Sequence, residues 1–135
     1  QSNYSAAKAG ILGLTLVQAA ELGRYGVTAN ALAPQARTGM TAGVFDDMMK
    51  KPEDGSFDQY DPANVAPLVV WLASDQSGHV NGRCFEMFGG KLSVADGWQH
   101  GVENDKGAMW APEEIGPAVE NLIADGPVQE KVYGA

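Results

Sequence analysis

Residues 6–34 read AAKAGILGLTLVQAAELGRYGVTANALAP, a helical pattern that is followed by a strand pattern. Residues 6–25 are apolar around most of a helical circumference, so we expect a helix that is buried against other elements. Gly26 is expected to end this helix. Residues 27–32 are typical of a short strand, and Pro34 is expected to stop it.

A second helix and a second strand follow the same order further along the chain. A proline at the first helical position, with Asp61 as the N-cap, predicts a helix over residues 62–74. Asn81–Gly82 is a turn, and residues 83–88 form a strand before a pair of glycines. The order helix, strand, helix, strand predicts the α/β class. It corresponds to half of a doubly wound sheet in which residues 27–33 and 83–88 are parallel neighbours.

The segments outside these units are less regular. Residues 35–61 are polar and interrupted by glycines, with one short helix expected near residues 44–51. A loop of this length in a domain is usually functional, often as an active-site cover. A further helix is expected over residues 112–124, with acidic side chains in its first turn. We expect Trp71 in the core, whereas Trp98 and Trp110 either cover a cleft or pack in a subunit interface.

Composition excludes several classes of protein. The chain has 135 residues, of which 44% are hydrophobic, so it is long enough for one folded domain. Its net charge of −8 argues against nucleic acid and against anionic membranes as partners. One cysteine excludes an internal disulfide and fits a reducing, cytoplasmic location. The two histidines and this cysteine are widely spaced, so no metal site is expected, and no apolar run is long enough to cross a bilayer.

Tyr4 and Lys8 carry the candidate chemistry. Side chains four residues apart on a helix lie on the same face. A phenol normally loses its proton near pH ~10, and a neighbouring ammonium favours the charged phenolate. Such a pair is suited to exchanging a proton with a carbonyl or alcohol oxygen. The matching hydride needs a cofactor, because no side chain supplies one.

Four motifs occur in the order and at about the spacing of one known family. They are Asn3-Tyr4-Ser5-Ala6-Ala7-Lys8-Ala9-Gly10, Val27-Thr28-Ala29-Asn30-Ala31-Leu32-Ala33-Pro34, Trp71-Leu72-Ala73-Ser74-Asp75, and Asn81-Gly82 before the strand that ends at Gly89-Gly90. Together they resemble the C-terminal half of short-chain dehydrogenases/reductases. The resemblance implies that residues 1–90 form the C-terminal half of a Rossmann-type domain, with a C-terminal extension over residues 91–135.

The resemblance also implies roles for individual residues. Tyr4 would be the general acid/base, and Lys8 would assist it and hold the nicotinamide ribose, so that both contact NAD or NADP. Backbone and hydroxyl groups of the segment that contains Pro34, Gln35, Ala36 and Thr38 would contact the nicotinamide carboxamide and the pyrophosphate. The family usually has glycine where this chain has Gln35, so the detailed contacts of this loop are expected to differ. The glycine-rich turn and the catalytic serine of the family precede the tyrosine, so we expect this chain alone to be inactive.

A narrower resemblance concerns the substrate. Further segments, among them Ala33-Pro34-Gln35-Ala36 and residues 65–72, are similar to the (3R)-hydroxyacyl-CoA dehydrogenase unit of peroxisomal multifunctional enzymes, also called 17β-hydroxysteroid dehydrogenase type 4. This implies an oxidoreductase of lipid metabolism that acts on 3-hydroxyacyl and 3-oxoacyl thioesters, as a homodimer or homotetramer. Two alternatives within the family are another alcohol or steroid dehydrogenase and a 3-oxoacyl-carrier-protein reductase. A non-catalytic oligomerisation module from a truncated gene is the alternative from another class.

Met48 and Met49 have two interpretations. Methionine adapts to flexible apolar ligands, so the pair is a candidate lining for an acyl pocket. The other interpretation, that they pack a covering helix onto the body of the domain, is favoured by the sequence alone.

Overall fold

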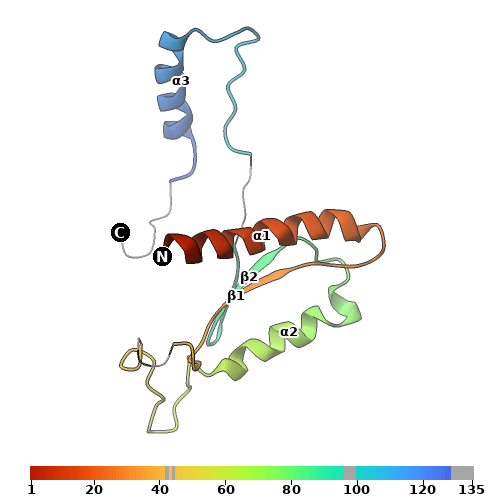
Figure 1. Cartoon of the computed structure of the whole chain (residues 1–135), viewed down its shortest axis with the longest axis vertical. Helices are drawn as coiled ribbons and strands as arrows, with labels where there is room; N and C mark the ends of the chain where they lie inside the picture. Colours follow the sequence, from red (N-terminus) through yellow and green to blue (C-terminus); the bar gives the residue numbers. More distant parts are fainter. Residues whose placement is uncertain (42, 44, 96–99, 129–135) are drawn as a thin grey trace. The chain divides into compact units, whose positions relative to one another are not determined.

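The computed structural model describes residues 1–41, 43, 45–95 and 100–128, and the chain separates into two compact units, Gln1–Gly97 and Trp98–Ala135. Figure 1 shows the elements along the chain. In order, they are α1 (Ser2–Gly23), β1 (Ala31–Gln35), a 3-10 turn (Pro62–Val65), α2 (Ala66–Leu72), a second 3-10 turn (Asp75–Ser77), β2 (Cys84–Phe88), β3 (Lys91–Ala95) and α3 (Pro112–Asp125).

The first unit contains a three-stranded sheet in the order β1-β2-β3. β1 and β2 are parallel, with Ala31 opposite Cys84 and Gln35 opposite Phe88, which confirms the predicted parallel pairing. β3 returns antiparallel to β2, so the sheet is mixed. β3 was not predicted from the sequence, because the glycine pair before it was interpreted as the end of the sheet rather than as a hairpin turn. α1 and α2 lie on opposite sides of the parallel pair (Figure 1).

β1 differs from its predicted extent. It begins at Ala31, and Pro34 lies inside it rather than beyond its end. The chain before Ala31 is held by side chains: the Asn81 Oδ1 accepts from the Ala29 N–H at 2.8 Å, and the Asn30 Nδ2 donates to the Val80 carbonyl at 2.9 Å. Proline is tolerated in β1 because this strand is at the edge of the described sheet, where a missing N–H costs no ladder bond.

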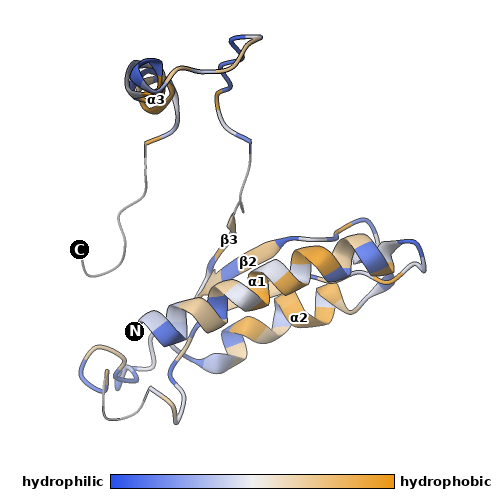
Figure 2. Ribbon diagram, turned by 45° about the horizontal axis from the view of Figure 1, so that its top comes forward, coloured by the Kyte–Doolittle hydropathy of each residue, from blue (hydrophilic) through white to orange (hydrophobic). Residues whose placement is uncertain are grey.

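α1 is less covered than the sequence suggests. Only Thr15 and Ala19 are buried, and Figure 2 shows apolar residues along the ribbon of this helix. Its exposed large apolar residues include Ile11, Leu12, Leu14, Leu16 and Val17. The prediction of a helix buried around its circumference was therefore wrong for the described unit.

The second half of α1 contacts the turn before β2. The Asn81 Nδ2 donates to the Ala19 carbonyl at 2.9 Å, and a Cβ added at Gly82 would lie 3.3 Å from the Ala19 Cβ. Gly82 also has φ +69°, a backbone conformation that glycine adopts without strain. This turn therefore needs both residues, asparagine for its hydrogen bonds and glycine for its shape and close approach.

The predicted cap of the second helix is confirmed, whereas the predictions of a helix near residues 44–51 and of Trp71 in the core are corrected. Asp61 caps the second helix as predicted, since its Oδ1 accepts from the Ala63 N–H at 2.8 Å, although the first turn is 3-10. Among the described residues of 44–51, residues 46–49 form a turn and none belongs to the predicted helix. Trp71 is 36% exposed rather than fully in the core, and its ring meets that of His79 edge-on at 6.4 Å.

The second unit contains α3, which confirms the helix predicted from residue 112. The Glu114 Oε2 accepts from the Ala111 N–H at 2.8 Å and pairs with Lys106, while the Lys106 Nζ lies 5.5 Å from the centre of the Trp110 ring. Bonds of this kind satisfy donors at a helix start. Trp98, the other tryptophan of the tail, lies outside the described residues.

Candidate active site

Tyr4 and Lys8 lie one turn apart at the start of α1. The helix begins directly after Gln1, whose carbonyl accepts from the Ser5 N–H at 2.9 Å. The Lys8 Nζ is 5.3 Å from the centre of the Tyr4 ring, inside the range of about 6 Å in which a cation is attracted to an aromatic face. Tyr4 is 58% exposed, so its phenol is accessible from solvent. The pair predicted from a four-residue spacing therefore forms a direct electrostatic contact.

The segment predicted to contact a cofactor lies at the end of β1. Pro34 and Gln35 are the last residues of the strand, and Ala36 follows directly. Because β1 runs back along α1, its carboxyl end and the start of α1 lie at the same end of the first unit (Figure 1). In open α/β sheets, ligands bind outside the carboxyl ends of the strands. The two groups of candidate residues therefore share the end of the sheet where a ligand is expected.

Thr38 begins a tight turn beyond β1. Its N–H donates to the Thr41 Oγ1 at 2.9 Å, and the same hydroxyl donates back to the Thr38 carbonyl at 2.9 Å. The Thr38 side chain itself is exposed. The turn therefore uses the backbone of Thr38 and the hydroxyl of Thr41, and it presents the Thr38 hydroxyl at the surface.

Arg37 and Asp58 form an ion pair that was not predicted from the sequence. The Arg37 guanidinium bonds both carboxylate oxygens, at 3.3 Å to Oδ1 and more closely to Oδ2, and its Nη1 donates to the Met49 carbonyl at 2.6 Å. The hydrogen bond from Arg37 is the main reason that the pKa of Asp58 lies below its usual value. The one available signal was a single arginine next to the predicted cofactor segment, and sequence alone did not indicate its partner.

The two methionines of the loop have different environments. Met49 is among the most buried apolar residues of the chain, whereas Met48 is exposed. The Met49 side chain therefore packs inside the unit, and only Met48 remains available to an incoming ligand.

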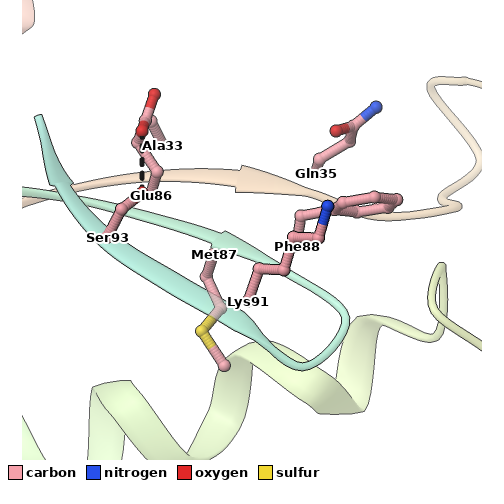
Figure 3. A pocket seen from close by; sticks show the side chains of 7 residues that line it. All are labelled: Ala33, Gln35, Glu86, Met87, Phe88, Lys91 and Ser93. Carbon is pink, nitrogen blue, oxygen red and sulfur yellow. Dashed lines mark hydrogen bonds between the residues drawn. The ribbon is translucent and has the colours of Figure 1, made fainter.

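A shallow depression of about 260 Å³ lies on the sheet itself (Figure 3). It is lined by Ala33, Gln35, Glu86, Met87, Phe88, Lys91 and Ser93. At one side of the depression, the Ser93 hydroxyl donates to the Glu86 Oε2 at 2.9 Å, so these two polar groups are already paired with each other. Tyr4 and Lys8 do not line this depression.

The described residues contain neither a metal site nor a membrane-spanning helix. No group of three or more His, Cys, Asp or Glu side chains in this part of the chain is arranged to hold a metal ion. None of the helices that the structure describes has both the length and the apolar content to span a bilayer.

Comparison with known proteins gives one family. The family model described as enoyl-(acyl carrier protein) reductase matches residues 1–91. Over the whole chain, the structure aligns with a crystal structure of a short chain dehydrogenase from Mycobacterium avium, with a TM-score of 0.79 and 51% sequence identity. The alignment covers 100% of this chain and 41% of that one.

Two curated relatives are hydroxyacyl-CoA dehydrogenases. The hydroxyacyl-CoA dehydrogenase ChsB1 of Mycobacterium tuberculosis is 41% identical over 125 residues, which are 92% of this chain and 39% of that protein. The human (3R)-3-hydroxyacyl-CoA dehydrogenase is 40% identical over 95 residues, which are 67% of this chain and 36% of that protein. The chain thus spans about two fifths of the length of these relatives.

Proposed function

This chain belongs to the short-chain dehydrogenase/reductase family, and we propose that it carries the acid/base pair of an NAD(P)-dependent enzyme that interconverts 3-hydroxyacyl and 3-oxoacyl thioesters. The observation that carries the proposal is the Lys8 ammonium held over the Tyr4 ring at the ligand end of the sheet. The names of the two curated relatives support the thioester as the substrate class.

The donor groups at this end of the sheet suit a nicotinamide dinucleotide. An exposed ammonium at Lys8, a carboxamide at Gln35 and a hydroxyl at Thr38 can all donate hydrogen bonds to ribose, carboxamide or phosphate oxygens. When bound, the dinucleotide supplies or accepts the hydride. We therefore assign Lys8, Gln35 and Thr38, with the backbone of Pro34 and Ala36, to holding it.

Tyr4 then moves the proton. In the oxidative direction its phenolate takes the proton from the substrate hydroxyl, and in the reductive direction its phenol gives that proton to the carbonyl oxygen. We assign Lys8, which lies one helical turn away with its Nζ 5.3 Å from the centre of the Tyr4 ring, to assisting this exchange. The 58% exposure of Tyr4 leaves the phenol open to a substrate on that side.

The exposed apolar residues of α1 favour a second candidate function. Many large apolar side chains exposed on one helix suggest that another part of the protein or another chain covers it. We propose that α1 contacts a second copy of the chain in a homodimer or homotetramer. If the chain acted only as such a module, it would self-associate but support no turnover.

The test uses a fusion protein, in which this chain follows the part of the Mycobacterium avium short chain dehydrogenase that precedes the region of alignment. Initial rates of nicotinamide reduction are measured with a (3R)-3-hydroxyacyl-CoA and with a simple secondary alcohol. We expect kcat/KM to be at least about tenfold higher for the thioester. A preference for the alcohol would contradict the proposed substrate, and a stable fusion protein without turnover would favour the module.

A further inference from the structure

Arg37, which lies between Ala36 and Thr38 of the segment assigned to the dinucleotide, makes four hydrogen bonds. Its backbone N–H donates to the Tyr60 carbonyl at 2.8 Å, and its guanidinium donates to the Met49 carbonyl and to both carboxylate oxygens of Asp58. These partners come from parts of the loop that are 12 to 23 positions away. One side chain therefore joins the end of β1 to the middle and to the end of the loop that follows it.

Asp58 continues this network toward α2. Its Oδ1 also accepts from the Tyr60 N–H at 3.1 Å, and its carbonyl accepts from the Asn64 Nδ2 at 2.9 Å, within the turn that precedes α2. The Asp58 side chain is only 10% exposed, so water competes little for its oxygens. By contrast, the Lys50–Asp47 pair in the same loop is largely exposed and joins residues that are only three positions apart. Of these two pairs, the Arg37–Asp58 pair is therefore the one that can order the loop.

We propose that Arg37 is a positioning residue, whose bonds to Met49 and Asp58 hold residues 35–38 in the arrangement that receives the dinucleotide. A guanidinium is suited to this role because its planar fork bonds two carboxylate oxygens and a carbonyl at once, which an ammonium does not. The backbone of a long loop is otherwise costly to order. The consequence for the dinucleotide rests on the proposed function, whereas the ordering of the loop does not.

Hydrogen exchange of the 135-residue chain tests the ordering. We expect Arg37→Gln and Asp58→Asn to speed exchange of the Arg37 and Tyr60 amides by about tenfold or more, while the Ala31 and Gly82 amides keep their protection. Arg37→Lys should give an intermediate result, because it keeps the charge but not the fork. Asp47→Asn removes the exposed pair and is the matched control.

The outcomes of this experiment separate the interpretations. An equal rise at all four amides would mean that Arg37 only stabilises the whole unit, and it would overturn the proposal. Unchanged exchange rates at the Arg37 and Tyr60 amides would also overturn the proposal. The proposal would fail as well if these two amides were unprotected in the unsubstituted chain.

Kinetics of the fusion protein test the consequence for the dinucleotide. We expect Arg37→Gln to raise the KM for NAD or NADP about tenfold while kcat changes less than about threefold, because Arg37 orders the binding segment without touching the reacting atoms. A loss of kcat at unchanged KM would overturn the positioning role. If the unsubstituted fusion protein has no activity, the proposed function fails, and the exchange experiment alone decides the ordering of the loop.

Discussion

At the scale of single residues, Lys8 is expected to have two effects. It is assigned both to assisting Tyr4 in proton transfer and to holding the dinucleotide, so Lys8→Met in the fusion protein should lower kcat and raise the KM for NAD or NADP, each by about tenfold or more. Lys50→Met is the control, because Lys50 is an exposed lysine that pairs only with Asp47 in the described structure. An effect on KM without any effect on kcat would mean that Lys8 does not assist the proton transfer.

The Asp58 carboxylate should titrate below the usual range of a carboxyl group. Its hydrogen bond from Arg37 lowers its pKa, with smaller contributions from the Tyr60 N–H and the Lys51 charge. The stabilising effect of the pair is therefore present above the usual carboxyl pKa of ~3.9 and is lost as the pH falls through the lower pKa of the folded state. Carbon-13 NMR of the Asp58 carboxyl group should show this midpoint rising in Arg37→Gln. An unchanged midpoint would contradict the assigned cause.

The Tyr4–Lys8 and Arg37–Asp58 pairs show which side-chain contacts can be predicted from the sequence. Tyr4 and Lys8 are four positions apart on one helix, so the helical repeat alone predicts their contact. Arg37 and Asp58 are 21 positions apart, and their contact depends on the path of an irregular loop. No periodicity in the sequence encodes that path.

At the scale of elements, the hairpin between β2 and β3 depends on Gly89. This residue has φ +55°, and a Cβ added there would lie 2.9 Å from the Gln59 Cβ and 3.1 Å from the Gln59 backbone. Gly89→Ala should therefore lower the free energy of unfolding by about 1–3 kcal/mol.

Gly90→Ala is the matched control, since nothing lies within 4 Å of a Cβ at the neighbouring position. Denaturant unfolding of both variants measures the difference. Equal stability of the two would mean that the hairpin does not lie close to Gln59.

The turn before β2 gives a second prediction for an element. Asn81 bonds the Ala29 N–H and the Ala19 carbonyl, and it thereby connects α1 to the approach of β1. Asn81→Ala leaves both backbone groups without this partner and should cost about 1–3 kcal/mol of stability, measured by denaturant unfolding. Asn104→Ala, at an exposed position of the second unit, is the control. A loss equal to that of the control would show that α1 is held by other contacts.

The bonds made by Asn81 show why the existence of an element was predicted more accurately than the residue at which it begins. Hydrophobic runs and the Asp61 cap are local signals, and they correctly gave α1, the helix after Asp61, β2, α3 and the parallel pairing. The start of β1 depends instead on side-chain bonds from residues about 50 positions away. The antiparallel β3 was missed because a glycine pair can end a strand or turn it back.

At the scale of the whole molecule, the exposed apolar side chains of α1 predict self-association. Apolar patches above a few hundred Å² rarely remain exposed on monomers, and unpaired strand edges such as that of β1 invite further pairing. Sedimentation at micromolar concentration should therefore give a dimer or tetramer. Leu14→Glu on α1 should shift the chain to smaller species, because Leu14 is 56% exposed on the proposed interface.

Val70→Glu on α2 is the control, because Val70 is 69% exposed but lies outside that interface. A soluble 14.2 kDa monomer with a cooperative melting transition would contradict the proposed association.

The assignment of Tyr4 as the acid/base is the central claim, and one substitution in the fusion protein tests it most directly. Tyr4→Phe keeps the ring beside Lys8 but removes the phenolic proton, so turnover of the 3-hydroxyacyl-CoA should fall by at least about 10²-fold while the dinucleotide still binds. Tyr25→Phe removes a hydroxyl beyond the other end of α1, from an exposed tyrosine, and should leave kcat unchanged. If Tyr4→Phe retained most of the rate of the unsubstituted fusion protein, Tyr4 would not be the proton carrier, and the proposed mechanism would be wrong.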